Sequence, residues 1–112
     1  MPIDKYFLEI ELSDKERYML FMKLVGLSHR TIANYVNSLS KCSMLIKENL
    51  EKAGYTSLYD VNKQDEIRKF QQLLETNKDF IALNHTSNNQ YSASVYNYVK
   101  FIDFLFVFGR KK

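Results

Sequence analysis

The chain has 112 residues, of which 46% are hydrophobic and 26% charged, and its formal net charge is +3. This length and mixture suit a single folded domain and exclude a disordered chain. Three glycines and one proline are too few for a many-stranded β fold, and no apolar run approaches the roughly 18 residues of a membrane span.

The compartment and the domain limits follow from the ends of the chain and from its lone cysteine. Cys42 has no second cysteine to pair with, which favours the reducing cytoplasm. The amino terminus carries acids early and lacks a long apolar run, so we expect no signal peptide. We expect an arm or short helix over 1–13, a helical domain over 14–108 and a basic tail or linker start over 109–112.

The first two clear helices are predicted from their caps. Ser13 precedes a helix over 14–25 that Gly26 ends, and Ser28 precedes a helix over 29–52. The second helix has one apolar stripe in steps of three or four residues: Ile32, Val36, Leu39, Cys42, Ile46 and Leu50. A break near Ser40 or Ser43 stays open, because this helix is long for a globular protein.

The second half of the chain predicts further short helices. A connector over 55–61 with one turn at 56–58 leads to a third helix from residue 62 or 63 to about 75, followed by a short fourth helix over 80–84. HTSNNQ at 85–90 is a polar loop, and a closing helix follows it. We therefore expect an all-α bundle of four to five helices.

Acidic residues are unevenly distributed. From Arg17 to Lys47 there are five basic residues and no acidic one, and from Phe80 to the end there are four basic residues and one acid, Asp103. We call these ranges the two acid-poor segments. If the fold brings them together they form one basic face; the alternative is an ordinary solvated surface.

The motif 26-GLSHRTIANYVNSLSK-41 is the most specific feature. A glycine turn leads into a serine-capped helix whose first turn presents Arg30 and Thr31 beside free backbone amides, a suitable place for a phosphate. Asn34 and Asn37 would reach base edges if this helix entered the major groove. The plain alternative is a capped helix start with an exposed arginine.

Two motifs carry a resemblance to a known family. GLS-x-x-T-I-x-x-Y-x-x-x-L and 88-NNQYSASVYNYVKFIDFL-105 resemble the SAM-like core-binding (N-terminal) domain of phage-integrase-type tyrosine recombinases, a pattern also found N-terminal to restriction-type nucleases. The likeness covers about residues 14–106. It implies a SAM-like orthogonal bundle that clamps duplex DNA, with the helices near 28–52 and 88–106 toward the DNA.

Position by position, the resemblance implies a set of DNA-contacting residues in both acid-poor segments: Ser28, His29, Arg30, Thr31, Asn34, Lys41, Asn88, Asn89, Gln90, Ser92 and Lys100. For 88–90 the alternative is a turn that caps the closing helix. The implied function is a non-catalytic duplex-DNA-binding domain of a recombinase, integrase or restriction-type enzyme, or a stand-alone relative.

The residues themselves predict no enzyme. There is no glycine-rich phosphate loop, no catalytic carboxylate pair and no nucleophile elbow, and two isolated histidines do not make a metal site. Tyr35, Tyr91 and Tyr98 alternate with apolar residues at helical spacing and are predicted to be core or rim residues. Cys42 lies on the apolar stripe, where packing is expected. We expect no cofactor and no metal.

A protein-interaction module is the competing hypothesis. Phe101, Phe104 and Phe108 form a second apolar face on the closing helix, and such a face is either central or covered by a partner. The partner would be a catalytic domain, a second copy or a target protein. A phage-encoded inhibitor or an oligomerisation domain would fit this description.

Overall fold

The structure is a computed structural model that describes residues 13–109. These residues form six α-helices and one 3-10 turn, with no strand among them. The all-α class and the helical bundle are thereby confirmed, with more helices than the expected four to five. The predictions for 1–12 and 110–112 lie outside the described residues.

Both predicted caps are confirmed. Helix α2 (Asp14–Leu24) begins at Ser13, whose hydroxyl accepts from the backbone N–H of Glu16 while the Glu16 carboxylate accepts from the N–H of Ser13. Helix α3 (His29–Leu45) begins at Ser28, whose Oγ accepts from the N–H of Thr31 at 3.1 Å. Gly26, with φ +91°, makes the turn between the two helices.

The prediction of one continuous helix over 29–52 is wrong. α3 ends at Leu45, Ile46 has φ −119° and ψ 30°, and a separate helix α4 (Lys47–Lys52) follows. The break that the sequence leaves open near Ser40 or Ser43 is present, three residues after Ser43. Cys42 before the break, Ile46 at it and Leu50 after it are all buried, so the apolar spacing continues through the break and cannot reveal it.

The later elements shift by a few residues from their predicted places. The single turn is η1 (Leu58–Asp60), followed by α5 (Gln64–Glu75), α6 (Lys78–Thr86) and α7 (Gln90–Gly109). Asn77 caps α6 by accepting from the N–H of Phe80, so this helix starts before its apolar residues. The polar loop of 85–90 is reduced to 87–89, and His85 lies inside α6.

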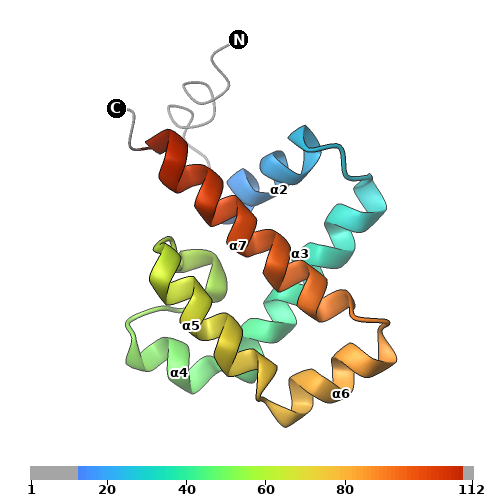
Figure 1. Ribbon diagram of the computed structural model, residues 1–112, viewed down its shortest axis with the longest axis vertical. Helices are drawn as coiled ribbons and strands as arrows, with labels where there is room; N and C mark the ends of the chain where they lie inside the picture. The colour runs from blue at the N-terminus through green and yellow to red at the C-terminus, as the bar shows by residue number, and fades with distance from the viewer. Residues whose placement is uncertain (1–12, 110–112) are drawn as a thin grey trace.

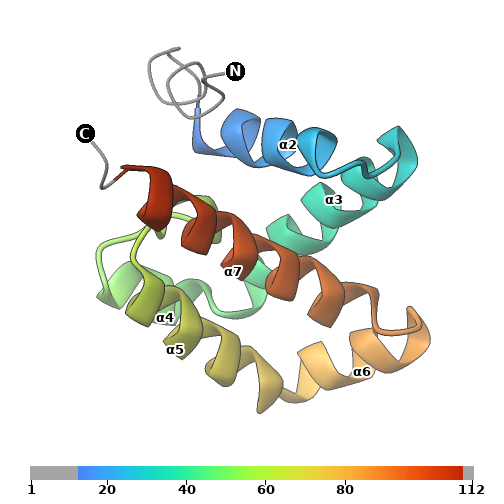
Figure 2. The ribbon, with the colours of Figure 1, turned by 45° about the horizontal axis from the view of Figure 1, so that its top comes forward.

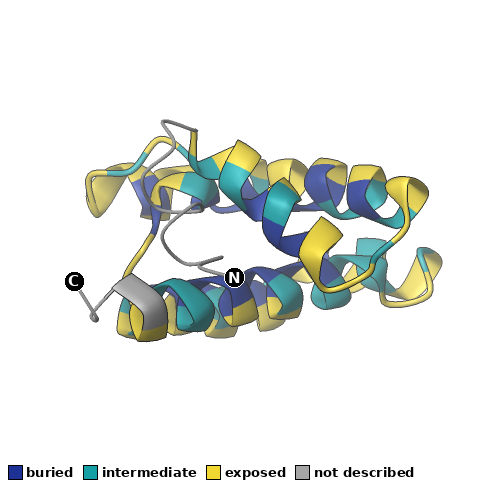
Figure 3. Ribbon diagram, turned by 90° about the horizontal axis from the view of Figure 1, so that it is seen from above, coloured by how far each residue is buried: buried dark blue, intermediate teal, exposed yellow. Residues whose placement is uncertain are grey.

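The helices form two layers. α7 crosses α3 rather than running alongside it (Figures 1 and 2), and α5 packs against α7. The shortest extent of the molecule is 19 Å, about two helix diameters. Buried residues lie between the layers and exposed residues lie on their outer sides (Figure 3). No helix of the described residues is long and apolar enough to cross a membrane.

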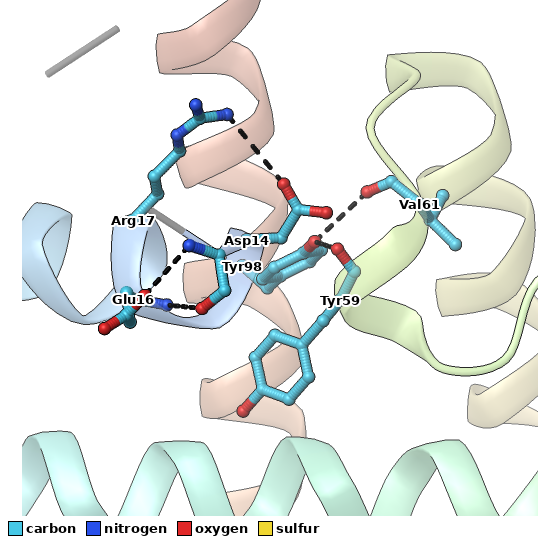
Figure 4. Close-up of polar contacts among 7 residues, drawn as sticks. Asp14, Glu16, Arg17, Tyr59, Val61 and Tyr98 are labelled. Carbon is cyan, nitrogen blue, oxygen red and sulfur yellow. Dashed lines mark hydrogen bonds and ion pairs between the residues drawn. The ribbon is translucent and has the colours of Figure 1, made fainter. Parts of the chain in front are cut away.

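Three tyrosines hold the layers together. The Tyr98 hydroxyl shares its one proton between the backbone oxygens of Tyr59 and Val61, at 3.0 and 3.1 Å (Figure 4). Tyr18 donates to the backbone oxygen of Ser94, and Tyr59 to that of Val36. The Tyr18 and Tyr98 rings meet edge-on, with centroids 5.0 Å apart. These contacts join α2, α3, η1 and α7 at one point.

We expect Tyr98→Phe to destabilise the fold. The ring still packs, but two carbonyl oxygens in the interior lose their donor, which costs about 1–3 kcal/mol of unfolding free energy. Urea denaturation measures this loss, and Tyr96→Phe on the exposed side of α7 is the matched control. Equal stability of the two variants would show that the Tyr98 hydroxyl contributes nothing.

Candidate functional site

The two acid-poor segments meet at a shallow depression of about 290 Å³. Its walls come from the first turns of α3 and from the turn that connects α6 to α7. We call it the polar depression, and its lining residues are Thr31, Asn34, Tyr35, Ser87, Asn88, Asn89, Gln90 and Ala93. Five residues predicted from the sequence thus come together: Thr31, Asn34, Asn88, Asn89 and Gln90.

The turn between α6 and α7 adopts a left-handed backbone. Asn88 and Asn89 have φ values of 59° and 67°, a region that asparagine tolerates better than most residues. Asn84 holds the turn from α6: its backbone oxygen accepts from the N–H of Asn89 at 2.8 Å, and its side-chain oxygen accepts from the N–H of Ser92 at 2.9 Å. Asn84 therefore caps α7, a role the sequence analysis did not predict.

Gln90 and Ser92 have internal partners. The Gln90 amide donates to the hydroxyl of Ser38 at 2.8 Å, and Ser38 is buried. The Ser92 hydroxyl donates to the backbone oxygen of Asn89 at 3.1 Å. These two side chains fix the turn against α3 and against itself, whereas the cap of α7 comes from Asn84 and not from 88–90.

Three carboxamides at the polar depression have no hydrogen-bond partner among the described residues. The side chains of Asn34, Asn88 and Asn89 form no hydrogen bond with any residue in the described range. Asn34 is half-buried, and Asn88 and Asn89 are exposed. Each carboxamide offers donors and an acceptor to a ligand.

Exposed cations flank the depression along both helices. Arg30 lies four residues before Asn34 and Lys41 seven residues after it, so all three share one stripe of α3. Lys100 lies seven residues after Ala93 on the same side of α7. Within the described part of the chain none of these three cations forms an ion pair.

The one acid of the second segment is already neutralised. Asp103 accepts from Arg68 Nη2 through both carboxylate oxygens, at 3.1 and 3.0 Å, and from the Gln64 amide at 2.7 Å. This contact joins α5 to α7. Because Arg68 balances its charge, Asp103 offsets little of the positive charge of Lys100.

Ser28 and His29 lie outside the polar depression. Ser28 caps α3 and donates to the Thr31 hydroxyl at 3.0 Å. His29 lines a different depression of about 320 Å³ between α2 and α3, together with Glu16 and Lys23 among others. The structure thus separates the start of the motif from the residues that follow it.

The aromatic face of α7 is mostly core. Phe101 is 1% exposed, so the expectation that it contacts a partner is wrong; it packs on Tyr18 and Phe21. Phe104 is half-buried, with its ring 5.2 Å from that of Phe21. The side chain of Phe108 lies outside the described residues. Packing of α2 onto this face is a tertiary contact that helical periodicity cannot predict.

Tyr96 is an exposed aromatic residue that the sequence analysis missed. It is 56% exposed, and the Lys100 ammonium lies 5.0 Å from its ring centroid. The available signal was its place on α7, four residues before Lys100 and opposite the buried stripe. Tyr96 and Lys100 therefore lie together on the exposed side of α7, beyond the polar depression.

The nucleophilic side chains of the interior are not activated. Burial raises the pKa of Tyr18 and Tyr98 far above the ordinary range, and raises that of Tyr59 to about 12. Burial also raises the pKa of the Cys42 thiol to about 12. In the described residues, no group of three or more His, Cys, Asp or Glu side chains could hold a metal ion.

Comparison of the chain with family models, with curated proteins and with solved structures gave no match in any of the three. The geometry of the polar depression and the charges around it are therefore the basis for a functional assignment.

We expect Cys42 to be unreactive in the native protein. A pKa of about 12 instead of 9.0 lowers the thiolate fraction near neutral pH about a thousandfold, and the thiol is also fully buried. A colorimetric thiol reagent at about pH 8 should label the urea-unfolded chain at once and the folded chain only as fast as it unfolds. Rapid labelling of the folded chain would contradict this.

The left-handed turn predicts a difference between two small substitutions. Asn88→Gly and Asn89→Gly should change the unfolding free energy by less than about 0.5 kcal/mol, whereas the alanine variants should each lose about 1 kcal/mol, because alanine disfavours positive φ. Urea denaturation of the four variants checks this. Alanine variants as stable as the glycine variants would contradict it.

Proposed function

We propose that this chain is a non-catalytic domain that binds duplex DNA through the polar depression and the cations around it. One observation carries the proposal. Two segments that are distant in sequence and poor in acids converge on one depression, where three carboxamides have no hydrogen-bond partner among residues 13–109. Arg30, Lys41 and Lys100 flank it, and no carboxylate in the described part of the chain forms an ion pair with them.

This combination suits a phosphate backbone. Arginine and lysine contact phosphates and release condensed counterions, while asparagine, serine and threonine donate to phosphate oxygens and to base edges. Most acidic residues after Ser13 lie in 48–79, which forms α4, η1, α5 and the start of α6. The acid-free α3 is therefore the side from which a polyanion would approach.

The same proposal extends to the kind of protein. The resemblance of the two motifs to the core-binding domain of phage-integrase-type tyrosine recombinases supports a role beside a catalytic domain of a recombinase, integrase or restriction-type enzyme, or as a stand-alone relative. The cytoplasm would be its location. Three flanking cations make few phosphate contacts, so we expect affinity to depend strongly on salt and on any linked domain.

A protein-interaction role has one observation in its favour. At the carboxyl end of α7, Phe106 and Val107 are 43% and 53% exposed. A partner seated on these side chains would bind in a salt-tolerant manner. Val107→Asp tests this role better than a substitution at half-buried Phe104, because it does not disturb the core.

We expect Arg30→Ala and Lys41→Ala each to weaken binding to a generic duplex and to lower the slope of log K against log salt by about 1. Fluorescence anisotropy between about 50 and 200 mM salt measures both quantities. Lys69→Ala, an exposed lysine of α5, is the matched control and should leave the slope unchanged.

The two hypotheses give different outcomes in that assay. A duplex affinity that is independent of salt, or equal in the Arg30, Lys41 and Lys69 variants, would overturn the DNA assignment. Loss of self-association in Val107→Asp, with no duplex binding by the parent chain, would favour the protein-interaction role.

A further inference from the structure

We infer that Asn34 and Asn37 of α3 read adenine edges in the major groove, so that duplex binding depends on sequence. The inference rests on the proposed function and adds to it a class of target. It starts from the outer stripe of α3, which has the order Arg30, Asn34, Asn37, Lys41: a cation, two carboxamides and a second cation.

These four residues lie on one side of the helix. Their spacings of four, three and four residues each correspond to about one helical turn. The buried residues of α3 lie on the other side, among them Ile32, Val36, Leu39 and Cys42. Arg30, Asn37 and Lys41 are exposed and Asn34 is half-buried at the edge of the polar depression. The stripe is therefore open to a ligand along its length.

The length of the stripe suits a major groove. Arg30 and Lys41 are eleven residues apart, which is about 16 Å along the axis of an α-helix. The groove of B-DNA is about 12 Å wide and admits an α-helix. With α3 in the groove, the two cations lie toward its ends, where they reach phosphates, while the two asparagines lie between them over the bases.

The chemistry of the two central residues selects the base. A carboxamide donates and accepts together, which matches the N7 acceptor and N6 donor that adenine presents in the major groove. Neither Asn34 nor Asn37 uses its carboxamide within the described structure. Three residues of helix span about 4.5 Å, close to the 3.4 Å between neighbouring bases, so the two side chains address adjacent base pairs.

Selection of bound duplexes from a randomised pool tests this inference. We expect enrichment of A·T at two neighbouring positions. Asn34→Ala and Asn37→Ala should each lose the preference at one of them, with discrimination falling roughly 5- to 150-fold as for a bidentate contact. Asn49→Ala, an exposed asparagine of α4, is the matched control and should keep the preference.

A modified base identifies the contact. Replacing the selected adenine by 7-deazaadenine removes N7 and keeps the pairing, so it should weaken the parent chain at that position. It should have no effect on the variant that lacks the corresponding asparagine.

The outcomes separate this inference from the proposed function. Salt-dependent duplex binding with no base preference would overturn adenine reading and leave the DNA assignment standing. Enrichment of G·C that disappears in Arg30→Ala would show that the arginine reads the bases, and it would also overturn adenine reading by the asparagines. Failure of the parent chain to bind any duplex would overturn both.

Discussion

The buried hydroxyl of Tyr98 is the contact on which the arrangement of the helices depends. It is held almost fully inside the protein and satisfies two backbone carbonyls of the segment that follows α4. A carbonyl without a donor in the interior costs more than a hydrogen bond contributes. α7 is therefore fixed against the segment of η1, which in turn contacts α3 through the Tyr59 hydroxyl.

The same constraint places the polar depression. With α7 held across α3, its first turn comes to rest beside the start of α3, and the Gln90 amide reaches the buried Ser38 hydroxyl. Asn84 and Gln90 already hold the turn, so the side chains of Asn88 and Asn89 have no hydrogen-bond partner within the range that the structure describes. Some polar side chains of this short turn thus hold the fold, and others line the polar depression.

The charged residues also fall into two groups, those that join helices and those that stay exposed around the polar depression. Asp103 lies in an otherwise basic segment, and its ion pair with Arg68 joins α7 to α5. Arg30 and Lys41 keep no such partner among the described residues. An exposed ion pair adds little stability, so the arrangement bears more on the surface potential around the depression than on the free energy of unfolding.

The sequence by itself determined the helical class, the caps at Ser13 and Ser28, the buried position of Cys42 and the two acid-poor segments, because each is a local or compositional signal. It left a break near Ser40 or Ser43 open but did not locate it at Ile46, since the apolar spacing is the same on both sides. Only the tertiary structure decided that Phe101 is core and that Gln90 bonds to Ser38. It also decided that Asn34 meets Asn88 and Asn89 at one depression. Those facts depend on how α7 crosses α3, which is a long-range packing that no local pattern encodes.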